Sequence, residues 1–403
     1  MQSATVNQQL LLASTRQKAP ASKQGVTNQD LGVKWKYEVL KDGTISLEGE
    51  YTIAAIPKST CGAIVIPPIV DGYTVSSIGR RAFGDCANLT AITIPRSITN
   101  IHAAAFNGCK KLKDFYVDSQ NPFFKSESGL LLSNDRQELI SYPGGRLFVS
   151  IPDCVIKINK GAFYSGSVYE RIEIPSSVVK IENWAFAGYH SRLSSISVDI
   201  DNEFYMIDHG MLITKDGKSL LRCPPAMDIK HIACSIPYGI EKIEEGAFSG
   251  CSLITRVEMP DSVKHIGRYA FTGCESLRNI SISGHITNIE DGIFSHCSSL
   301  KTVVIPDGVT RIGRSAFSMC DTLRSIEIPK SVKYIGSHAF FYCESLESIE
   351  FLGDRPIFDG DWAGGRYRVT KKITVPDNES WRDVKDLERN FIVVKKKRWE
   401  IWK

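Results

Sequence analysis

Phenylalanine recurs in this sequence at a fixed interval, and that interval limits the possible folds more than any other feature. The interval is 23 residues, and it connects these positions: Phe83 and Phe106; Phe163 and Phe186; and Phe248, Phe271, Phe294, Phe317 and Phe340. A period of about 20 to 50 residues is typical of solenoids, in which each repeat packs only on its neighbours. The sequence therefore predicts a stack of coils with one continuous core.

Each repeat also contains a short alternating segment. In the repeat that begins at Phe317, Ile326 and Ile328 flank Glu327, so both isoleucines share one strand face and Glu327 points away. Pro329 follows, and proline lacks the N–H that a continuing strand would need. We therefore expect one short strand per coil, with phenylalanine stacked on phenylalanine when the coils are in register.

The spacing between phenylalanines lengthens twice, to 57 and to 62 residues. In both places the second half of a coil is kept and only the first half is replaced. The replacements, near residues 121–143 and 202–224, match each other at an offset of 81 residues. The second contains an Asp-Gly pair, a typical hairpin turn, so we predict two inserted β-hairpins.

The two ends of the chain depart from the repeat. Residues 1–30 contain little to bury and are interpreted as a flexible leader. An open stack exposes an apolar face at each end, so we expect residues 31–78 to form an N-terminal hairpin cap with a first partial coil. The solenoid itself is predicted over residues 79–350, and residues 351–403, where the pattern lapses, are predicted to form a C-terminal cap.

Composition and charge exclude few classes of partner. Apolar residues make up 42% of the chain, enough for a packed core, and the net charge of +4 is too small to indicate a nucleic-acid partner. No apolar run approaches the roughly 18–20 residues of a transmembrane helix. Residues 1–13 contain no lysine or arginine before their short apolar cluster, so no signal peptide is visible. We expect a monomer with no nucleic-acid partner and no membrane span.

One composite motif recurs: Ala-Phe, then Cys, Leu and Ile-x-Ile-Pro. It stands as AFGDCANLTAITIP at 82–95, AFTGCESLRNISI at 270–282 and AFSMCDTLRSIEIP at 316–329. At this pitch the motif resembles the BspA-type leucine-rich repeat family over about residues 36–375. The resemblance implies a right-handed leucine-rich-repeat β-solenoid with one strand ladder, two inserted hairpins and a cap at each end. It also implies an extracellular or cell-surface location and an adhesin-like role, because members of that family resemble secreted or surface-attached binding proteins.

No arrangement of residues typical of catalysis is visible. Seven of the eleven cysteines occupy one repeat position: Cys86, Cys109, Cys251, Cys274, Cys297, Cys320 and Cys343. They lack the C-x-x-C spacing of zinc sites and are interpreted as small buried packing groups. A bridge between Cys223 and Cys234 remains open, and the histidines form no H-E-x-x-H or similar pair. We predict a protein that is not an enzyme and has no metal and no cofactor.

Two surfaces are candidates for binding. The outward positions of the strand ladder form the first, and its candidate residues are Tyr116, Arg171, Glu173, Arg256, Glu258, Asn279, Glu327 and Glu350. A basic edge on the opposite side forms the second, and its candidate residues are Lys264, Arg268, Arg311, Arg314, Lys330 and Lys333. For both surfaces the alternative is a solvated face without a partner.

Three functions are compatible with these surfaces. The first is a secreted or cell-surface recognition protein that binds a host or neighbouring-cell protein through the strand face. The second is an intracellular protein-interaction scaffold, which the missing signal peptide favours. The third is a binder of an anionic polysaccharide through the basic edge.

Overall fold

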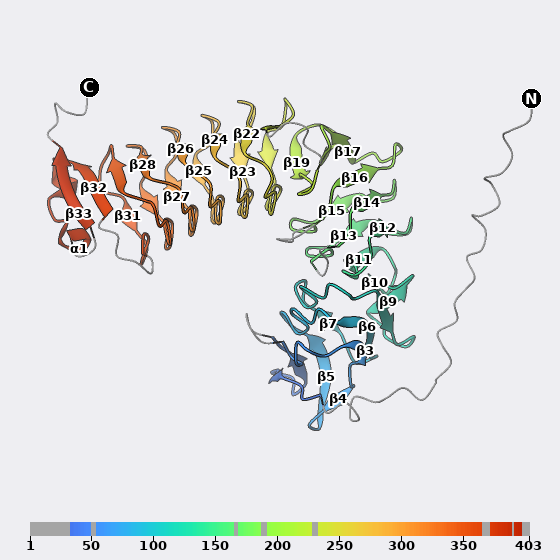
Figure 1. The fold of residues 1–403 in the computed structure, drawn as a ribbon. Coiled ribbons are helices and arrows are strands. Elements are labelled where there is room, and N and C mark those ends of the chain that lie inside the picture. Colours follow the sequence, from blue (N-terminus) through green and yellow to red (C-terminus); the bar gives the residue numbers. More distant parts are fainter. Residues whose placement is uncertain are drawn as a thin grey trace, which may run out of the picture.

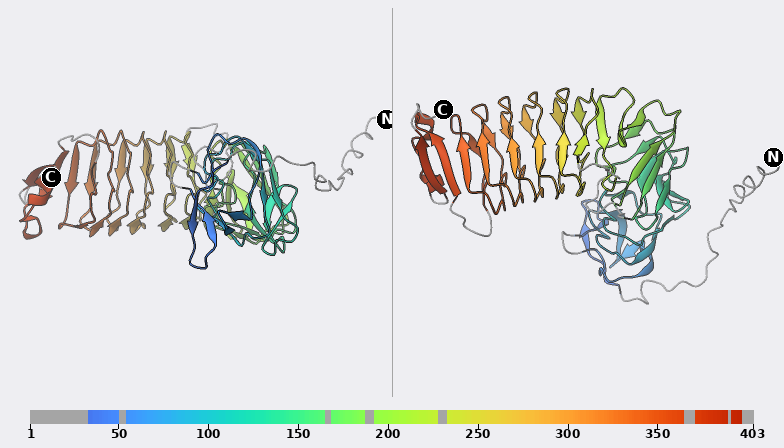
Figure 2. Two further views of the ribbon diagram at one scale, coloured as in Figure 1. Left: turned by 90° about the horizontal axis from the view of Figure 1, so that it is seen from below. Right: turned by 45° about the horizontal axis from the view of Figure 1, so that its top comes forward.

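The computed structural model describes residues 33–49, 54–164, 168–186, 192–227, 233–364, 371–388 and 391–396. Figure 1 shows an elongated stack of coils that changes direction near its middle, and Figure 2 shows the regular C-terminal coils from two further sides. Within the described residues, the helical elements are η1 (Glu379–Trp381) and α1 (Lys385–Glu388). The leader predicted at residues 1–30 lies outside the described part of the chain.

Parallel strands along one side of the stack form what we call the main ladder. The repeat strands of this ladder place side chains outward on both sides of a buried residue, as in Arg171–Ile174, where exposed and buried residues alternate. The strands belong to four sheets: β3 (Gly62–Val65), β6 (Leu89–Ile94) and β8 (Asp114–Val117); β12 (Phe148–Ser150), β14 (Arg171–Ile174) and β16 (Ser195–Val198); β20 (Ala233–Ser235), β22 (Arg256–Glu258), β24 (Asn279–Ser281) and β26 (Thr302–Val304); and β28 (Ser325–Ile328), β30 (Ser348–Phe351), β32 (Lys371–Pro376) and β33 (Phe391–Lys396).

A second ladder runs along the other side of the stack, where the sequence predicts only one ladder. Its strands are two residues long, so each shows at most one buried residue and no alternation that a sequence pattern could reveal. They are β7 (Asn100–Ile101), β13 (Lys157–Ile158), β15 (Lys180–Ile181), β21 (Lys242–Ile243), β23 (His265–Ile266), β25 (Asn288–Ile289), β27 (Arg311–Ile312), β29 (Tyr334–Ile335) and β31 (Ile357–Phe358).

The predicted phenylalanine stack is confirmed. Phe294 is fully buried, and its ring lies 5.6 Å from that of Phe271 and 5.5 Å from that of Phe317, with the ring planes close to parallel. Adjacent thiols add a contact that the sequence does not reveal, because Cys320 donates a hydrogen bond of 3.3 Å to the carbonyl of Phe294 one coil earlier. The repeated core is therefore held by ring stacking and by thiol-to-carbonyl hydrogen bonds.

Both inserts are hairpins, each with a third strand. The first consists of β9 (Phe124–Glu127), β10 (Leu130–Ser133) and β11 (Glu138–Ser141), and the second of β17 (Tyr205–Asp208), β18 (Met211–Thr214) and β19 (Ser219–Arg222). The first two strands pair antiparallel, while the third also pairs in parallel with the next strand of the second ladder. Each insert thus replaces half a coil and begins a new section of the second ladder, because its third strand pairs with the next strand of that ladder while the ladder strand before the insert belongs to another sheet.

One buried asparagine fixes each insert to the coil before it. Asn202 is 1% exposed, and its Nδ2 donates to the carbonyls of Pro175 and Val178 at 2.9 and 3.0 Å. Its Oδ1 accepts hydrogen bonds from the backbone of Phe204 and Tyr205. Asn121 makes the same four types of contact in the first insert.

The stack axis turns where the second insert joins the C-terminal coils (Figures 1 and 2). There the main ladder is interrupted, since β16 and β20 belong to different sheets. The buried apolar residues likewise divide into three clusters, which meet at the two inserts. The protein is therefore a bent solenoid of three stacked sections.

Both ends of the described stack are covered. At the N-terminal end β1 (Tyr37–Val39) and β2 (Ile45–Leu47) form a hairpin, and β4 (Ile69–Val70) pairs with β5 (Tyr73–Ile78). At the C-terminal end, Trp362 and Trp381 are buried against the last coil. Large aromatic side chains thus cover the apolar end of the stack.

Candidate interaction faces

The outer face of the main ladder forms two columns of side chains. All eight candidate residues lie on it, in β8, β14, β22, β24, β28 and β30. Seven are exposed and Glu350 is partly exposed. They do not form one compact site, because the breaks between the sheets distribute them over the three sections of the stack.

The C-terminal section contains the longest regular part of this face. Arg256 lies beside Asn279 in register, and Asn279 lies beside Thr302, whose hydroxyl donates to the Asn279 side chain at 3.1 Å. In the neighbouring column, Ser235 donates to Glu258 at 2.8 Å. Short contacts along a column hold polar side chains in fixed order while leaving them accessible.

Two glutamates lie side by side near the distal end of the same face. Glu327 lies beside Glu350 in register, and Lys396 forms an ion pair of 2.6 Å with Glu350. Like charges on neighbouring strands are unfavourable, so Lys396 relieves part of the repulsion between the two carboxylates.

Three apolar or aromatic side chains are exposed on this face, and two of them, Phe148 and Val304, were not among the eight candidate residues. Phe148 is 65% exposed and lies in register with Arg171, and Val304 is 76% exposed in the column of Glu327. The third, Tyr116, is one of the candidate residues and is 44% exposed in the N-terminal section. Each of these side chains stands at an outward position of its strand, so the alternating pattern predicts that it faces solvent. Its apolar character is what makes it a candidate contact residue.

The basic edge lies along and beside the second ladder, but its charge is largely compensated in the C-terminal section. Lys264 pairs with Glu241 at 3.1 Å, and Arg268 lies 3.8 Å from Glu290. Asp291 forms an ion pair of 3.5 Å with Arg311 and accepts a backbone hydrogen bond from Arg314. These acidic partners lie one coil away from the basic residues they meet, so reading each coil separately does not reveal them.

The remaining basic-edge residues, Lys330 and Lys333, are exposed. Lys333 immediately precedes β29, whereas Lys330 follows Pro329 at the end of a main-ladder strand. The six predicted residues therefore do not form one continuous basic stripe.

The cysteine column is buried, as the sequence predicts. Removal from water is the largest cause that raises the pKa of the Cys86 thiol to about 11 and raises that of Cys320 well above its ordinary value. Cys223 and Cys234 are free thiols, and hydrogen bonding with Cys234 and Cys251 raises the pKa of Cys223. Among the described residues, no group of three or more histidine, cysteine or acidic side chains is arranged to hold a metal ion.

Comparison with known proteins identifies the family. The sequence matches the family described as "BspA type Leucine rich repeat region", in six copies, over residues 62–128, 147–212 and 228–351. The match covers more than half of the chain. The chain belongs to the BspA-type leucine-rich repeat family. This confirms the resemblance on which the predicted fold rests, and the two ladders described above show how the BspA-type repeats stack in this protein.

Solved structures with leucine-rich repeats are similar to this BspA-type chain. A leucine-rich cell surface protein from Faecalibacterium prausnitzii A2-165 is 29% identical, with a TM-score of 0.49, and the alignment covers 80% of this chain and 94% of that one. A leucine-rich repeat protein from Eubacterium ventriosum is 21% identical, with a TM-score of 0.48 and coverage of 87% and 95%. The pneumococcal vaccine antigen PcpA is 20% identical, with a TM-score of 0.48 and coverage of 90% and 97%. None of the curated proteins matches the sequence.

No helix in the described part of this BspA-type protein has the length and apolar character needed to cross a membrane.

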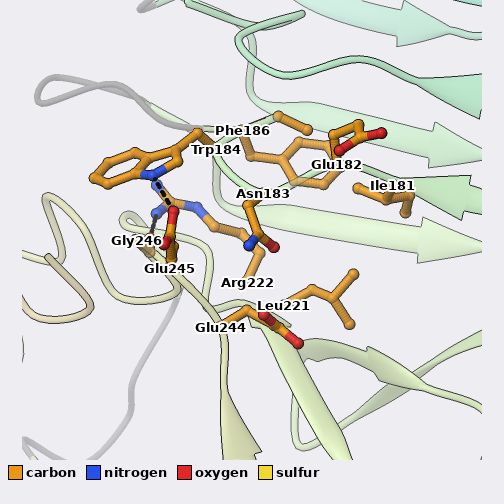
Figure 3. Close-up of a pocket in the computed structure, with 11 residues that line it drawn as sticks. Ile181, Glu182, Asn183, Trp184, Phe186, Leu221, Arg222, Glu244, Glu245 and Gly246 are labelled. Carbon is orange, nitrogen blue, oxygen red and sulfur yellow. Dashed lines mark hydrogen bonds between the residues drawn. The ribbon is translucent and has the colours of Figure 1, made fainter. Parts of the chain in front are cut away.

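A pocket at the bend of the BspA-type stack contains a buried arginine, which the sequence analysis did not identify (Figure 3). Arg222, the last residue of β19, is 1% exposed, and its Nη1 donates to the carbonyl of Gly246 at 2.9 Å. The pocket is lined by Ile181, Glu182, Asn183, Trp184, Ala185, Phe186, Leu221, Arg222, Glu244, Glu245 and Gly246. The first insert has Ser141 at the equivalent position, 81 residues earlier, so the departure from the duplicated pattern was the available signal.

Trp184 forms one wall of this pocket and connects coils on either side of the second insert. Its Nε1 donates to Glu245 at 2.9 Å, and its ring packs at 5.5 Å from Tyr269. A side chain at Gly246 would approach within 3.0 Å of the indole, so this glycine allows the close contact. Trp184 has a φ of 65°, an uncommon conformation for a bulky residue, which the surrounding contacts must stabilise.

Proposed function

We propose that this BspA-type protein is a non-catalytic recognition protein that binds a macromolecular partner, most simply a protein, through the outer face of the main ladder. The observation that carries the proposal is the ordered column of exposed side chains in the C-terminal section. Arg256 and Asn279 belong to it, and Val304 lies in the column beside it. A solenoid presents such a face over many coils, so many modest contacts can add to a specific interface.

The mixture of side chains supports a protein partner. Phe148, Tyr116 and Val304 provide exposed apolar area, while Arg171, Arg256 and the carboxylates provide polar contacts around it. Aromatic residues and arginine are enriched where proteins bind proteins. The aromatic residues stand singly and do not form the repeated stripe on which sugar rings would stack.

The test compares two variants of the full chain in capture experiments with extracts of neighbouring or host cells. The ladder variant carries Arg171→Ala, Arg256→Ala and Glu258→Ala, and the control variant carries Lys264→Ala and Arg268→Ala on the opposite edge. We expect the ladder variant to lose its captured partner by at least about tenfold, because interface residues of this kind contribute about 1 kcal/mol or more each. Equal capture by both variants would contradict binding through the main ladder.

We also propose a secreted or cell-surface location, by analogy with the similar leucine-rich cell surface protein and in line with the family resemblance. Fractionation of the native protein tests this location. Recovery from the cytosol alone would favour an intracellular interaction scaffold.

Binding of an anionic polysaccharide through the basic edge is the weaker alternative. Glu241, Glu290 and Asp291 lie within ion-pair distance of three of its basic residues and reduce their attraction for an anionic chain. We therefore expect elution from a heparin column below about 0.3 M salt, where screening is already strong. Retention beyond that concentration would restore this alternative.

A further inference from the structure

The last strand of the main ladder, β33, has one paired edge and one open edge. In a parallel sheet the backbone groups of alternate residues point to opposite neighbours. Asp377 donates its backbone N–H to the carbonyl of Lys396 at 3.0 Å, and β33 pairs with β32 in register over all of its 6 residues. This pattern turns the even-numbered residues of β33 toward β32 and leaves the backbone groups of Phe391, Val393 and Lys395 pointing away from it.

The described part of the chain leaves this outward edge without a partner. None of its groups forms a hydrogen bond with the backbone N–H or C=O groups of Phe391, Val393 or Lys395. The aromatic lid contacts a side chain of β33, since the ring of Trp362 lies 5.5 Å from that of Phe391. Figure 1 shows β33 as the last strand at the C-terminal end of the stack. Such an edge is a template for pairing with another strand.

The side chains of β33 are apolar over most of its length. Ile392 is 53% exposed, Val394 is partly exposed, and Phe391 and Val393 pack on the last coil without full burial. Charged side chains are the usual protection of an open edge, and here they stand only at the end of the strand. One of them, Lys396, is already held by its ion pair with Glu350.

We propose that β33 pairs antiparallel with β33 of a second copy of this chain, about a two-fold axis beside Val393, so that the protein forms a closed dimer. This register places Phe391 opposite Lys395 of the second copy and pairs the outward backbone groups of all three residues, which gives about six hydrogen bonds. Ile392 then lies opposite Val394 of the second copy. Cross-strand pairs of β-branched side chains are favourable in antiparallel sheets.

The charges on the strand favour this arrangement over the alternatives. In the proposed register no lysine lies opposite a lysine, whereas parallel pairing of two β33 strands in register would place Lys395 beside Lys395, which is unfavourable. The open strand at the other end of the stack, β1, is only 3 residues long and contains Glu38, so it offers less to a head-to-tail contact. Two-fold pairing uses the open edge of both copies and therefore does not continue into a fibre.

The dimer would join two main ladders into one continuous sheet. A two-fold axis perpendicular to the sheet keeps the outer faces of both copies on the same side. A partner with repeated binding sites would then meet two equal faces at once, which raises its overall affinity without any new type of contact. The pairing itself does not depend on the proposed function of that face.

Sedimentation equilibrium of the full chain tests the dimer. We expect the average mass to rise from that of one chain toward that of two between about 1 and 100 µM, since a contact smaller than about 1,200 Å² is typically weak. A mass of one chain up to about 100 µM would overturn the proposal. A mass that grows beyond two chains would also overturn it, because it would indicate an open, head-to-tail contact.

Two variants locate the contact. Val393→Pro removes an N–H that points away from β32, so the strand should still pair within its own chain; we expect the dissociation constant to rise at least about tenfold, because two hydrogen bonds at the axis are lost. Ile392→Lys should weaken the dimer to a similar extent, because it places a charge opposite Val394 of the second copy. The matched control is Val304→Lys, at another exposed apolar position of the same ladder. An equal effect of Ile392→Lys and Val304→Lys would overturn the proposal.

The residues that follow Lys396 are the alternative occupant of the edge, because they include Trp399 and Trp402. If the native chain stays monomeric while the full chain with both tryptophans changed to alanine dimerises, the edge belongs to the chain's own end and the proposal is wrong. Under the proposal the native chain dimerises without that change.

Disulfide trapping gives a measurement that does not require a disrupted contact. In a Cys61→Ser background, which removes the exposed thiol, Val393→Cys should form a cross-linked dimer on oxidation with diamide. Facing residues of such a pair have Cα atoms about 5.5 Å apart, within the range of a disulfide. Ile357→Cys, exposed in β31 at the same end of the stack, should not cross-link. Equal cross-linking at both positions, or none at Val393→Cys, would overturn the proposed pairing.

Discussion

Replacing Phe294 with alanine tests directly whether neighbouring coils hold one another in place. Phe294 is fully buried between the rings of Phe271 and Phe317. Removing the ring loses a transfer free energy of about 2 kcal/mol and leaves a cavity of roughly 100 Å³, which at about 24 cal/mol per Å³ adds ~2 kcal/mol. We therefore expect the free energy of unfolding of the cooperative unit that contains this coil to fall by about 4 kcal/mol.

Urea titration measures the total loss for Phe294→Ala, and hydrogen exchange locates it. Because each coil contacts only its neighbours, protection should fall most in the coils of Phe271, Phe294 and Phe317 and least in the N-terminal coil of Phe83. Val304→Ala is the matched control, since that side chain is 76% exposed and its loss should change stability by less than about 0.5 kcal/mol. A cost below about 1 kcal/mol for Phe294→Ala, or an equal loss of protection along the whole chain, would refute a core built by stacking.

The remaining predictions concern the insert, the close packing of coils and the thiols. Asn202→Ala should cost about 3 kcal/mol in a urea titration, because it removes four buried hydrogen bonds, whereas Asn279→Ala on the exposed ladder should be nearly neutral. Gly267→Ala should cost about 1–3 kcal/mol, because its Cβ would lie 2.6 Å from a backbone nitrogen of the preceding coil; an unchanged Tm would contradict this close approach. At pH 8 Ellman's reagent should modify exposed Cys61 quickly and partly exposed Cys154 slowly, because burial and raised pKa values keep the column thiols protonated. Unfolding without reductant should release all eleven thiols, and a smaller number would indicate a disulfide.

The repeating core was predictable because the same set of residues to be buried recurs in every coil of the sequence. Phe317, Ile326 and Ile328 each recur at the same phase, so a wrong interpretation of one coil is corrected by the others. The family match and the stacked rings confirm that part of the prediction. The inserts were predictable for a related reason, since their duplication exposed the residues that both copies keep.

What the sequence did not reveal depends on contacts between coils that differ from the repeat. The acidic partners of Lys264 and Arg311 lie in the preceding coil, so a single repeat shows only the basic residue. Arg222 occurs once, and its burial depends on the bend that brings Trp184 and Gly246 together. Such features have no periodic signal and become visible only when the coils are placed in space.

The two kinds of building unit in this chain control different properties of its outer face. A further 23-residue coil would lengthen the row of outward side chains and leave its direction nearly unchanged. The second insert lies where the axis turns, and its last strand, β19, pairs in parallel with β21 and so starts the regular C-terminal part of the second ladder. Related chains can therefore lengthen this outer face by gaining coils and change its direction by gaining or losing an insert. Neither change requires many substitutions in the buried core.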